Sequence, residues 1–513
     1  MCTGKNETFI LYWHEVMYSL IFKENLHTYS YFKHNKGGDY RRWCGNWENI
    51  LKYSPSHLTE MTKNDGFRHD GKEYYLRQHI GWSKITSSLS SFRFYPEGFS
   101  FDSAGLAIFS DKKQFLYDAI LFLNSSIAMY LIQILNPTLN VTPQIIKKLP
   151  FLECSKLHRD LCGQLVNIAQ SDWDSYETSW DFTTLPLLSS DFRQSTLAAT
   201  YAALRAYWRS ITLEMQCLEE ENNRIFIEAY GLQDELTPDV PLKEITLTCN
   251  PHYRYGGDKT EEELEALLQA DTMKEFISYA VGCMFGRYAL EKPGLILANQ
   301  GETYADYLKQ VPAPAFPADK DNVIPMLDGE WFADDITERF RRFLRLTFGE
   351  EHYEENLAFI EQAIGKDIRK YFTKDFYNDH VKRYKKRPIY WLFSSPKGSF
   401  NALIYMHRYV PDTVSIVLND YLREFQTKLA TEKALQETIE ASASSSPAEK
   451  AKATKKLDTI RKTIKELENY ECDTLYPLAT RQIAIDLDDG VKANYPKFGA
   501  ALKKIPGLEA KEE

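Results

Sequence analysis

The sequence lacks the features that mark metalloproteins, secreted proteins and membrane proteins. Its eight cysteines form no C-x-x-C pair and no set with histidines at metal-ligand spacing, so we predict neither a zinc site nor a disulfide framework. No run of about 18 apolar residues occurs, and no cationic region followed by a long apolar core opens the chain. We therefore expect reduced thiols, no metal, no membrane contact and a cytoplasmic location.

An excess of positive charge is also missing. The 513 residues include 62 Lys and Arg against 72 Asp and Glu, which gives a formal net charge of -10. Such a chain has no general basic field to hold nucleic acid, so any DNA contact has to come from local clusters. Its length and its 43% hydrophobic content are sufficient for several packed cores.

What the sequence does contain is a basic stretch at residues 31–47, in which cations and aromatics surround a glycine pair. Glycines let a backbone approach a bulky polyanion closely, and Lys and Arg donate charge-assisted hydrogen bonds to phosphates and base edges. The residues predicted to contact DNA here are Lys33, Lys36, Gly37, Gly38, Arg41 and Arg42. The alternative is a surface turn with solvated cations, in which Trp43 and Trp47 fill a core.

Two further groups of residues have the chemistry of a DNA contact. In a second basic cluster at 366–387, nine Lys or Arg stand against three Asp, and aromatic residues alternate with them. The predicted contacts there are Lys382, Arg383, Lys385, Lys386 and Arg387. Nearer the N-terminus, the side chains suited to base edges are Lys84, Thr86, Ser87 and Arg93. A solvated helix face and turn-capping hydroxyls are the respective alternatives.

Several strings of the sequence resemble one known family. They are Thr3-Gly4-Lys5-Asn6 with Phe9, Trp13 and Glu15-Val16; Lys36–Trp43, of the form Lys-Gly-Gly-x-x-Arg-x-Trp; Ile80–Ser87 with Arg93, Gly98, Phe101-Asp102 and Ala104-Gly105; Leu135–Thr138 with Lys147–Pro150; Arg387–Ser395; Phe400–Tyr405; Leu487–Lys492; and Ile505–Leu508. In these strings the chain is similar to PglX-type adenine-specific DNA methyltransferases of BREX phage-defence systems, and to their TaqI-like specificity domain.

The resemblance implies DNA recognition rather than catalysis by these residues. A complete enzyme of the family carries, before its recognition region, a domain that binds S-adenosylmethionine and holds a flipped adenine. We expect that domain to be missing from this chain, which would then bind no cofactor itself. The implied partners are double-stranded DNA, the missing methyltransferase domain in cis or in trans, and other BREX subunits.

One string resembles the Asn-Pro-Pro-Tyr loop with which such enzymes hold the adenine amino group. Asn250-Pro251-His252-Tyr253 has His in place of the second Pro, and it follows a short strand predicted at 245–249. No glycine-rich turn that would hold a methyl donor closes a preceding strand. We interpret the string as a strand followed by an Asn-Pro turn, and we predict no catalytic residue.

Hydrophobic periodicity predicts a mixed α+β fold. Short strands are expected at 92–95 and 105–110, and one helix over 114–135. Helical spacing dominates after residue 154, and a Ser-rich tip between two charged helices predicts a projecting αα-hairpin at about 414–468. The expected parts are a TaqI-like target-recognition module at 1–153, a helical connector at 154–231, a mixed α/β segment ending in a Pro-rich linker at 232–330, and a helix-rich C-terminal domain at 331–513.

The predicted function is the sequence-recognition portion of a site-specific adenine-N6 DNA methyltransferase, inactive by itself. The alternative is a protein-interaction module of the defence complex with little autonomous DNA binding, which the overall acidity favours.

Overall fold

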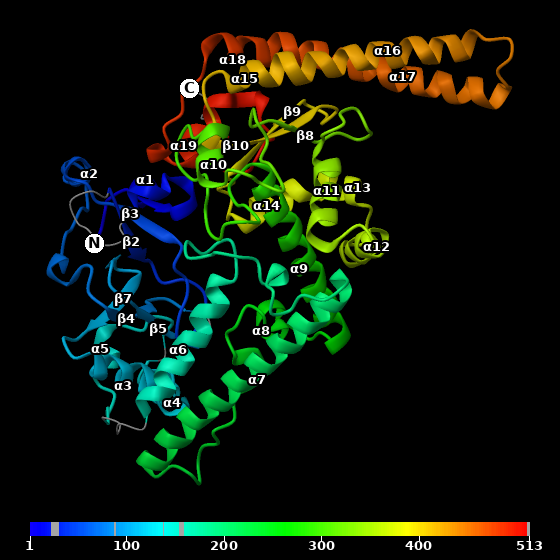
Figure 1. Ribbon diagram of the computed structural model, residues 1–513. Helices are drawn as coiled ribbons and strands as arrows, with labels where there is room; N and C mark the ends of the chain where they lie inside the picture. The colour runs from blue at the N-terminus through cyan, green and yellow to red at the C-terminus, as the bar shows by residue number, and fades with distance from the viewer. Residues whose placement is uncertain (22–29, 87–88, 137, 153–157, 510–513) are drawn as a thin grey trace. The chain divides into compact units, whose positions relative to one another are not determined.

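The computed structural model describes residues 1–21, 30–86, 89–136, 138–152 and 158–509. By its internal contacts the chain divides into two compact units. Unit 1 consists of Met1–His14 and Tyr18–Thr272, and unit 2 consists of Glu15–Met17 and Met273–Glu513. Figure 1 gives the element labels used below.

Unit 1 contains two open sheets. The four-stranded sheet has the order β1-β3-β2-β6, and only its β2–β6 pair is parallel; the three-stranded sheet has the antiparallel order β5-β4-β7. The strands are β1 (Ile10–Tyr12), β2 (Tyr31–Asn35), β3 (Asn49–Lys52), β4 (His79–Ser83), β5 (Phe92–Tyr95), β6 (Phe99–Phe101) and β7 (Gly105–Phe109). A side chain at Gly81 of β4 has no room, because a Cβ there would lie 2.4 Å from the Asn35 amide and 2.6 Å from the Tyr95 ring.

Helices make up the rest of unit 1. They are α1 (Asn6–Phe9), α2 (Pro55–Met61), α3 (Lys113–Leu123), α4 (Ser126–Leu135), α5 (Pro143–Ile146), α6 (His158–Asp174), α7 (Leu197–Tyr230), α8 (Pro251–Tyr255) and the first part of α9 (Glu261–Met284). The 34-residue α7 begins at the Thr196 cap, whose hydroxyl accepts from Ala199 N–H, and ends at Gly231 in the left-handed region.

The single helix expected over 114–135 is wrong, because α3 and α4 meet at a bend of 72°. Asn124 uses its side chain to hold β5, accepting from Phe92 N–H and donating to Phe92 C=O. The Ser125 hydroxyl then caps α4 by accepting from Ala128 N–H. Among the described residues no single helix is long and apolar enough to cross a membrane, and this bent pair alone passes a test of length and composition.

Unit 2 combines a small sheet with many helices. The sheet has the order β8-β10-β9 and consists of β8 (Ile324–Pro325), β9 (Tyr390–Ser394) and β10 (Asn401–Tyr405). The α-helices after α9 are α10 (Tyr304–Gln310), α11 (Ile336–Phe348), α12 (Tyr353–Ile364), α13 (Ile368–Tyr371), α14 (Tyr377–Arg383), α15 (Thr413–Ile416), α16 (Arg423–Ala441), α17 (Pro447–Tyr470), α18 (Tyr476–Arg481) and α19 (Val491–Asn494). π-helical turns at 372–376, 417–422 and 471–475 join α13 to α14, α15 to α16 and α17 to α18.

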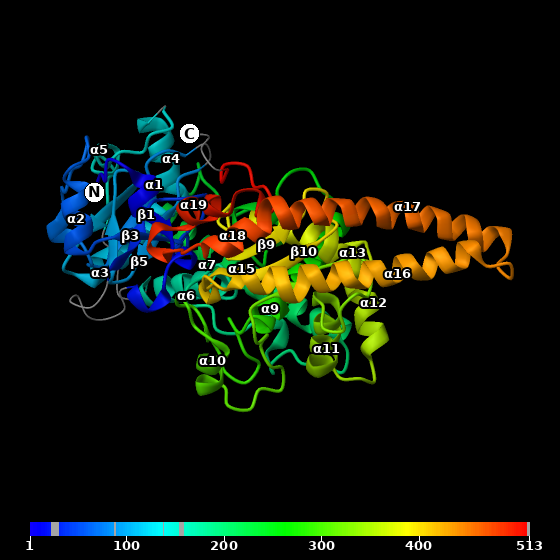
Figure 2. The same cartoon turned by 90° about the horizontal axis from the view of Figure 1, so that it is seen from above.

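The αα-hairpin expected at about 414–468 corresponds to α16 and α17, which lie side by side in both views (Figures 1 and 2). Its charged outer faces are solvated, while Leu429, Leu457 and Leu467 are buried. Ser446 and Glu449 form a capping box at the start of α17.

A short segment from the N-terminal part of the chain completes unit 2. The buried Glu15 carboxylate accepts from Val491 N–H at 2.9 Å and lies 3.8 Å from the Arg387 guanidinium. The Val16 carbonyl pairs with the buried His407 ring at 3.1 Å. Residues 15–17 therefore supply partners to groups far along the sequence.

The predicted mixed α+β fold is confirmed by these open sheets and their helices. The contacts separate two units near residue 272, within α9. The finer division at 153, 231 and 330 stays a prediction.

Candidate nucleic-acid interface

The glycine pair of the basic stretch shapes the turn after β2. Gly37 has φ 77° and Gly38 has φ 126°. A Cβ at Gly37 would lie 3.0 Å from the Ser83 hydroxyl and 3.1 Å from the Ala104 carbonyl, so the turn packs closely against the end of β4. Gly37 is buried and Gly38 is exposed, so of the two only Gly38 presents its backbone at the surface.

Arg41 is buried and fully engaged within unit 1. Its guanidinium forms an ion pair with Asp172 at 2.7 Å and donates to the Thr248 hydroxyl at 2.8 Å. It also donates to the Cys44 and Ala169 carbonyls at 2.9 and 3.3 Å. Asp172 in turn accepts from the backbone N–H of Thr248 and of Cys249. Arg41 therefore joins the basic stretch to α6 and to the loop before α8.

Arg42 is buried in the same way. It pairs with Glu219 of α7 at 2.6 Å and with Glu244 at 3.1 Å. The Trp43 indole N–H donates to the other Glu219 oxygen at 2.7 Å. Burial raises the pKa of Glu219, although the Arg42 charge and the Trp43 hydrogen bond act against that rise.

Arg93 is also inaccessible, with 0% of its surface exposed. Its guanidinium donates to the Arg41 carbonyl and the Ser91 hydroxyl, both at 3.1 Å, and to the Ser83 hydroxyl at 3.3 Å. In this structure the three arginines hold unit 1 together, so we do not include them in the proposed contact surface. Their predicted direct contact with DNA stays an untested prediction.

The remaining predicted residues of unit 1 lie nearer the surface. Lys36 and Lys84 are half-buried. The Lys33 ammonium lies 4.5 Å from the centre of the Trp180 ring and 4.0 Å from Asp181. The Thr86 hydroxyl donates to the Leu89 carbonyl at 3.3 Å. Ser87 lies outside the described residues.

Three loops that the sequence analysis singled out meet at one pocket of unit 1, here called the recognition pocket. Its volume is about 430 Å³. Tyr40 comes from the basic stretch, Leu89 from the segment after Thr86, and His252 and Tyr253 from the methyltransferase-like string. Its lining residues are Tyr40, Leu89, Lys243, Glu244, His252, Tyr253, Gly256, Gly257, Lys259 and Leu264.

The recognition pocket mixes aromatic, cationic and acidic groups. The Tyr253 hydroxyl donates to the Tyr40 carbonyl, which fixes the loop at the pocket. The Tyr40 hydroxyl is buried and has no hydrogen-bond partner among the described residues, and burial raises its pKa above the ordinary range. Tyr40 therefore stays a protonated donor at neutral pH.

Asn250 is not placed as a catalytic amide. Its side-chain nitrogen donates to the Leu242 and Ile245 carbonyls at 2.7 and 2.8 Å, and its oxygen accepts from His252 N–H. The strand predicted at 245–249 is wrong, because these residues form turns around the buried Asn250, which caps α8. Asn250 and Pro251, interpreted from the sequence as a turn, instead begin α8, with Asn250 as its cap and Pro251 as its first residue.

The second basic cluster lies in unit 2, at the end of α14. Lys382, Lys385 and Lys386 are exposed, whereas Arg383 and Arg387 are half-buried. Lys385 and Lys386 have φ of 50° and 60°, so the chain turns sharply there. The buried His380 ring accepts from Tyr390 N–H at 3.1 Å, which fixes α14 against β9.

The aromatic residues of this cluster do not form a stacking surface. Tyr371, Phe372, Phe376, Tyr377 and Tyr384 are all buried, with 0–5% of their surface exposed. They pack in the interior of unit 2 and leave the cations on the surface.

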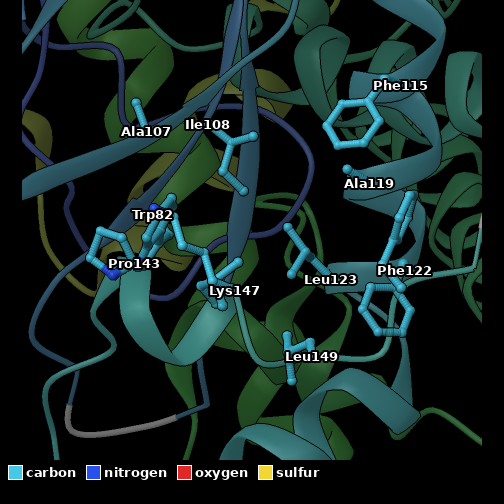
Figure 3. Close-up of a pocket in the computed structure, with 12 residues that line it drawn as sticks. Trp82, Ala107, Ile108, Phe115, Ala119, Phe122, Leu123, Pro143, Lys147 and Leu149 are labelled. Carbon is cyan, nitrogen blue, oxygen red and sulfur yellow. The ribbon is translucent and has the colours of Figure 1, made fainter.

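A second pocket of unit 1, of about 360 Å³, has a different chemistry (Figure 3). Phe115, Phe122 and Leu123 of α3 face Trp82 and Ile108 across it. Lys147 is the cation among its lining residues, and none of the described residues predicted to contact DNA lines it. This pocket suits an apolar group rather than a phosphate.

Comparison with known proteins finds relatives of this chain. An adenine-specific methyltransferase, BrxX, of Escherichia coli O9:H4 (strain HS) is 34% identical over 526 residues, which cover 98% of this chain and 42% of that protein. The chain is homologous to adenine-specific methyltransferases. PglX of Lacticaseibacillus casei (strain Zhang) is also 34% identical, over 542 residues that cover 99% of the chain and 42% of PglX.

The chain thus spans less than half the length of the two relatives. No protein-family model matches it. The homology supports the resemblance found in the sequence strings, while the TaqI-like character of residues 1–153 stays a prediction.

The sequence analysis missed several residues of the recognition pocket. Tyr40 lies inside the basic stretch, but the contacts predicted there were the charged residues and the glycine pair. Lys243 and Lys259 flank the methyltransferase-like string, and the Gly256-Gly257 pair beside it was the available signal for a close backbone approach.

Proposed function

We propose that this chain forms the DNA-recognition part of a site-specific adenine-N6 methyltransferase of a BREX system. The main observation behind the proposal is that three loops, each singled out by its sequence, meet at the recognition pocket. Homology to two adenine-specific methyltransferases supports it.

The proposed contact surface has two parts, one in each unit. In unit 1 it comprises Lys36, Gly38, Lys84 and Thr86, which lie in the loops that lead to the recognition pocket. In unit 2 it comprises Lys382, Lys385 and Lys386, with Arg383 and Arg387 beside them. Lysines of this kind neutralise phosphates, and the pocket supplies groups that discriminate bases.

We assign no methyl-donor site to these residues. S-adenosylmethionine is the donor that the resemblance implies, but the string nearest to a catalytic loop has its Asn250 amide committed to two backbone carbonyls. We propose that methyl transfer needs residues outside the two units.

The test is fluorescence anisotropy with a library of short duplexes at two salt concentrations, with and without S-adenosylmethionine. We expect sequence-selective binding that weakens with salt and is independent of the methyl donor. Tritium transfer from labelled donor to DNA by the purified chain would contradict the proposed division of roles.

A second candidate function is protein interaction within the defence complex. The apolar pocket in Figure 3 is the observation that favours it, because a partner's apolar side chain would fit there. Ala119→Glu, which places a charge in this pocket, should abolish co-purification of a partner and leave DNA binding unchanged if both functions are present. Unchanged co-purification would remove this candidate.

A further inference from the structure

We propose that a basic pocket of the αα-hairpin binds an acidic segment of another protein. The pocket, here called the hairpin pocket, lies within unit 2, where the turn between β9 and β10 meets the C-terminal half of α17. Its volume is about 460 Å³. Its lining residues are Pro396, Lys397, Arg461, Lys462, Lys465, Glu466 and Asn469. This proposal goes beyond the proposed function and does not rest on it.

The turn between β9 and β10 forms one wall of the hairpin pocket, and hydrogen bonds fix its shape. Gly398, with φ 72°, donates its N–H to the Ser395 carbonyl at 2.8 Å. The Glu466 carboxylate of α17 holds the turn by accepting from Lys397 N–H at 2.7 Å and from the Ser399 hydroxyl at 2.6 Å. The turn therefore lies beside the cations of α17 before any ligand binds, which lowers the entropic cost of binding.

Positive charge dominates the hairpin pocket. Four exposed side chains carry it, namely Lys397, Arg461, Lys462 and Lys465. The ammonium groups of Lys397 and Lys462 form no ion pair with another described residue. The carboxylate among the lining residues, Glu466, is 8% exposed and both of its oxygens accept from the turn. Charge complementarity therefore favours an anionic ligand.

The surroundings of the pocket favour a protein segment over a nucleic acid. Carboxylates lie next to its cations, because Arg461 is 3.6 Å from Glu437 and 3.9 Å from Asp458, and Lys465 is 3.8 Å from Glu468. Double-stranded DNA carries one charge for about every 1.7 Å of its axis, so its backbone would bring phosphates close to these carboxylates. A protein segment can place Glu or Asp side chains at the cations and neutral residues opposite the carboxylates.

The experiment uses a fluorescein-labelled peptide of about 12 residues in which Glu alternates with Ala. The same peptide with Gln in place of Glu is its neutral counterpart. Fluorescence anisotropy measures the binding of each peptide to the full chain at two salt concentrations. We expect the Glu peptide to bind, with an affinity that falls as salt is added, and the Gln peptide not to bind.

The test variant combines Lys462→Glu with Lys465→Glu, two exposed positions of the hairpin pocket. The matched control combines Lys452→Glu with Lys455→Glu, because these exposed cations of α17 do not line the pocket and the change in net charge is the same. We expect affinity for the Glu peptide to fall roughly tenfold in the test variant and less than about twofold in the control.

Three peptide results would overturn the proposal. They are no binding of the Glu peptide, equal binding of the two peptides, and an equal loss of affinity in the two variants, which would show attraction to net charge alone.

A duplex of about 20 base pairs tests the nucleic-acid alternative. We expect the test variant and its control to bind this duplex equally. A loss of roughly tenfold confined to the test variant would make the hairpin pocket a DNA contact and would overturn the assignment to a protein. Failure of the proposed function has a different signature, namely no binding of the duplex by the unsubstituted chain, and the peptide results then decide the proposal by themselves.

Discussion

The basic stretch of unit 1 and the second basic cluster of unit 2 are similar in composition but differ in surroundings. Arg41 and Arg42 are 3% and 4% exposed and bind carboxylates, whereas Lys382 and Lys385 lie on the surface. The partners of the two arginines are 131 and 177 residues away along the chain. Cations in such a sequence can therefore be committed to carboxylates that are distant along the chain, as Arg41 and Arg42 are, and Arg387 of the second cluster likewise lies 3.8 Å from the buried Glu15.

The largest expected effect is on the stability of unit 1. Arg42→Ala leaves Glu219 buried without its cation, and we expect a loss of about 3 to 5 kcal/mol in the free energy of unfolding of this unit. Urea titration followed by hydrogen exchange of unit 1 peptides measures it.

Lys382→Ala is the matched control, because it removes an exposed cation of unit 2 and should change stability by less than about 0.5 kcal/mol. Equal stability of Arg42→Ala and Lys382→Ala would show that the buried arginine has no structural role and would return it to the contact surface.

The second expected effect is a loss of stability at low pH in both units. Burial lowers the pKa of His79 in unit 1 to about 4 and that of His407 in unit 2 to about 3. In the folded protein the pKa of each histidine lies below the value of about 6.5 that it has in the unfolded chain. The stability that each neutral, buried histidine contributes is therefore complete above pH 6.5 and is lost as the pH falls. We expect each histidine to lower stability by about 2 kcal/mol between pH 7 and pH 5.

Urea midpoints at the two pH values, again resolved by hydrogen exchange for each unit, provide the measurement. His79→Gln should reduce the decline for unit 1 only, and part of that decline should remain because burial also lowers the pKa of His34. A decline in unit 1 that persists undiminished in this variant would mean that other groups cause it.

The third expected effect concerns DNA affinity rather than stability. Replacing Lys382, Lys385 and Lys386 by Ala should lower the slope of log affinity against log salt by about 2 to 3, because each lysine that neutralises a phosphate contributes about one. The comparison variant replaces Lys452, Lys455 and Lys462, three exposed cations of α17. Equal slopes in the two triple variants would remove unit 2 from the proposed surface.

The smallest expected effect belongs to Lys36. It is a half-buried cation next to the glycine pair, and Lys36→Ala should lower the salt slope by about one without a change in stability. Anisotropy at several salt concentrations measures the slope. An unchanged slope would leave the recognition pocket as the main contact of unit 1.

Local sequence patterns predicted much of the fold. The strands predicted at 92–95 and 105–110, observed as β5 and β7, and the Ser-rich tip before α17 all follow from residues that are close in sequence. The bend at Asn124 did not, because that side chain serves the backbone of Phe92, 32 residues away.

The candidate site was less accessible to sequence reasoning for the same reason. The basic stretch and the Asn250 string are recognisable separately, but their meeting at the recognition pocket depends on tertiary contacts such as the Tyr253 hydroxyl donating to the Tyr40 carbonyl. Charge alone drew attention to Arg41 and Arg42 and away from Tyr40.

The contacts of the segment Glu15–Met17 affect when unit 2 can fold during synthesis of the chain. Its partners Arg387, His407 and Val491 leave the ribosome several hundred residues later, with a separation of 476 residues for the Glu15–Val491 pair. Unit 2 therefore cannot complete its core from residues 273–513 alone, and its folding closes a loop that contains Tyr18–Thr272, the larger part of unit 1. Separate expression of the two halves would cut this connection, whereas a synthetic peptide of the N-terminal segment should restore order to an isolated second half.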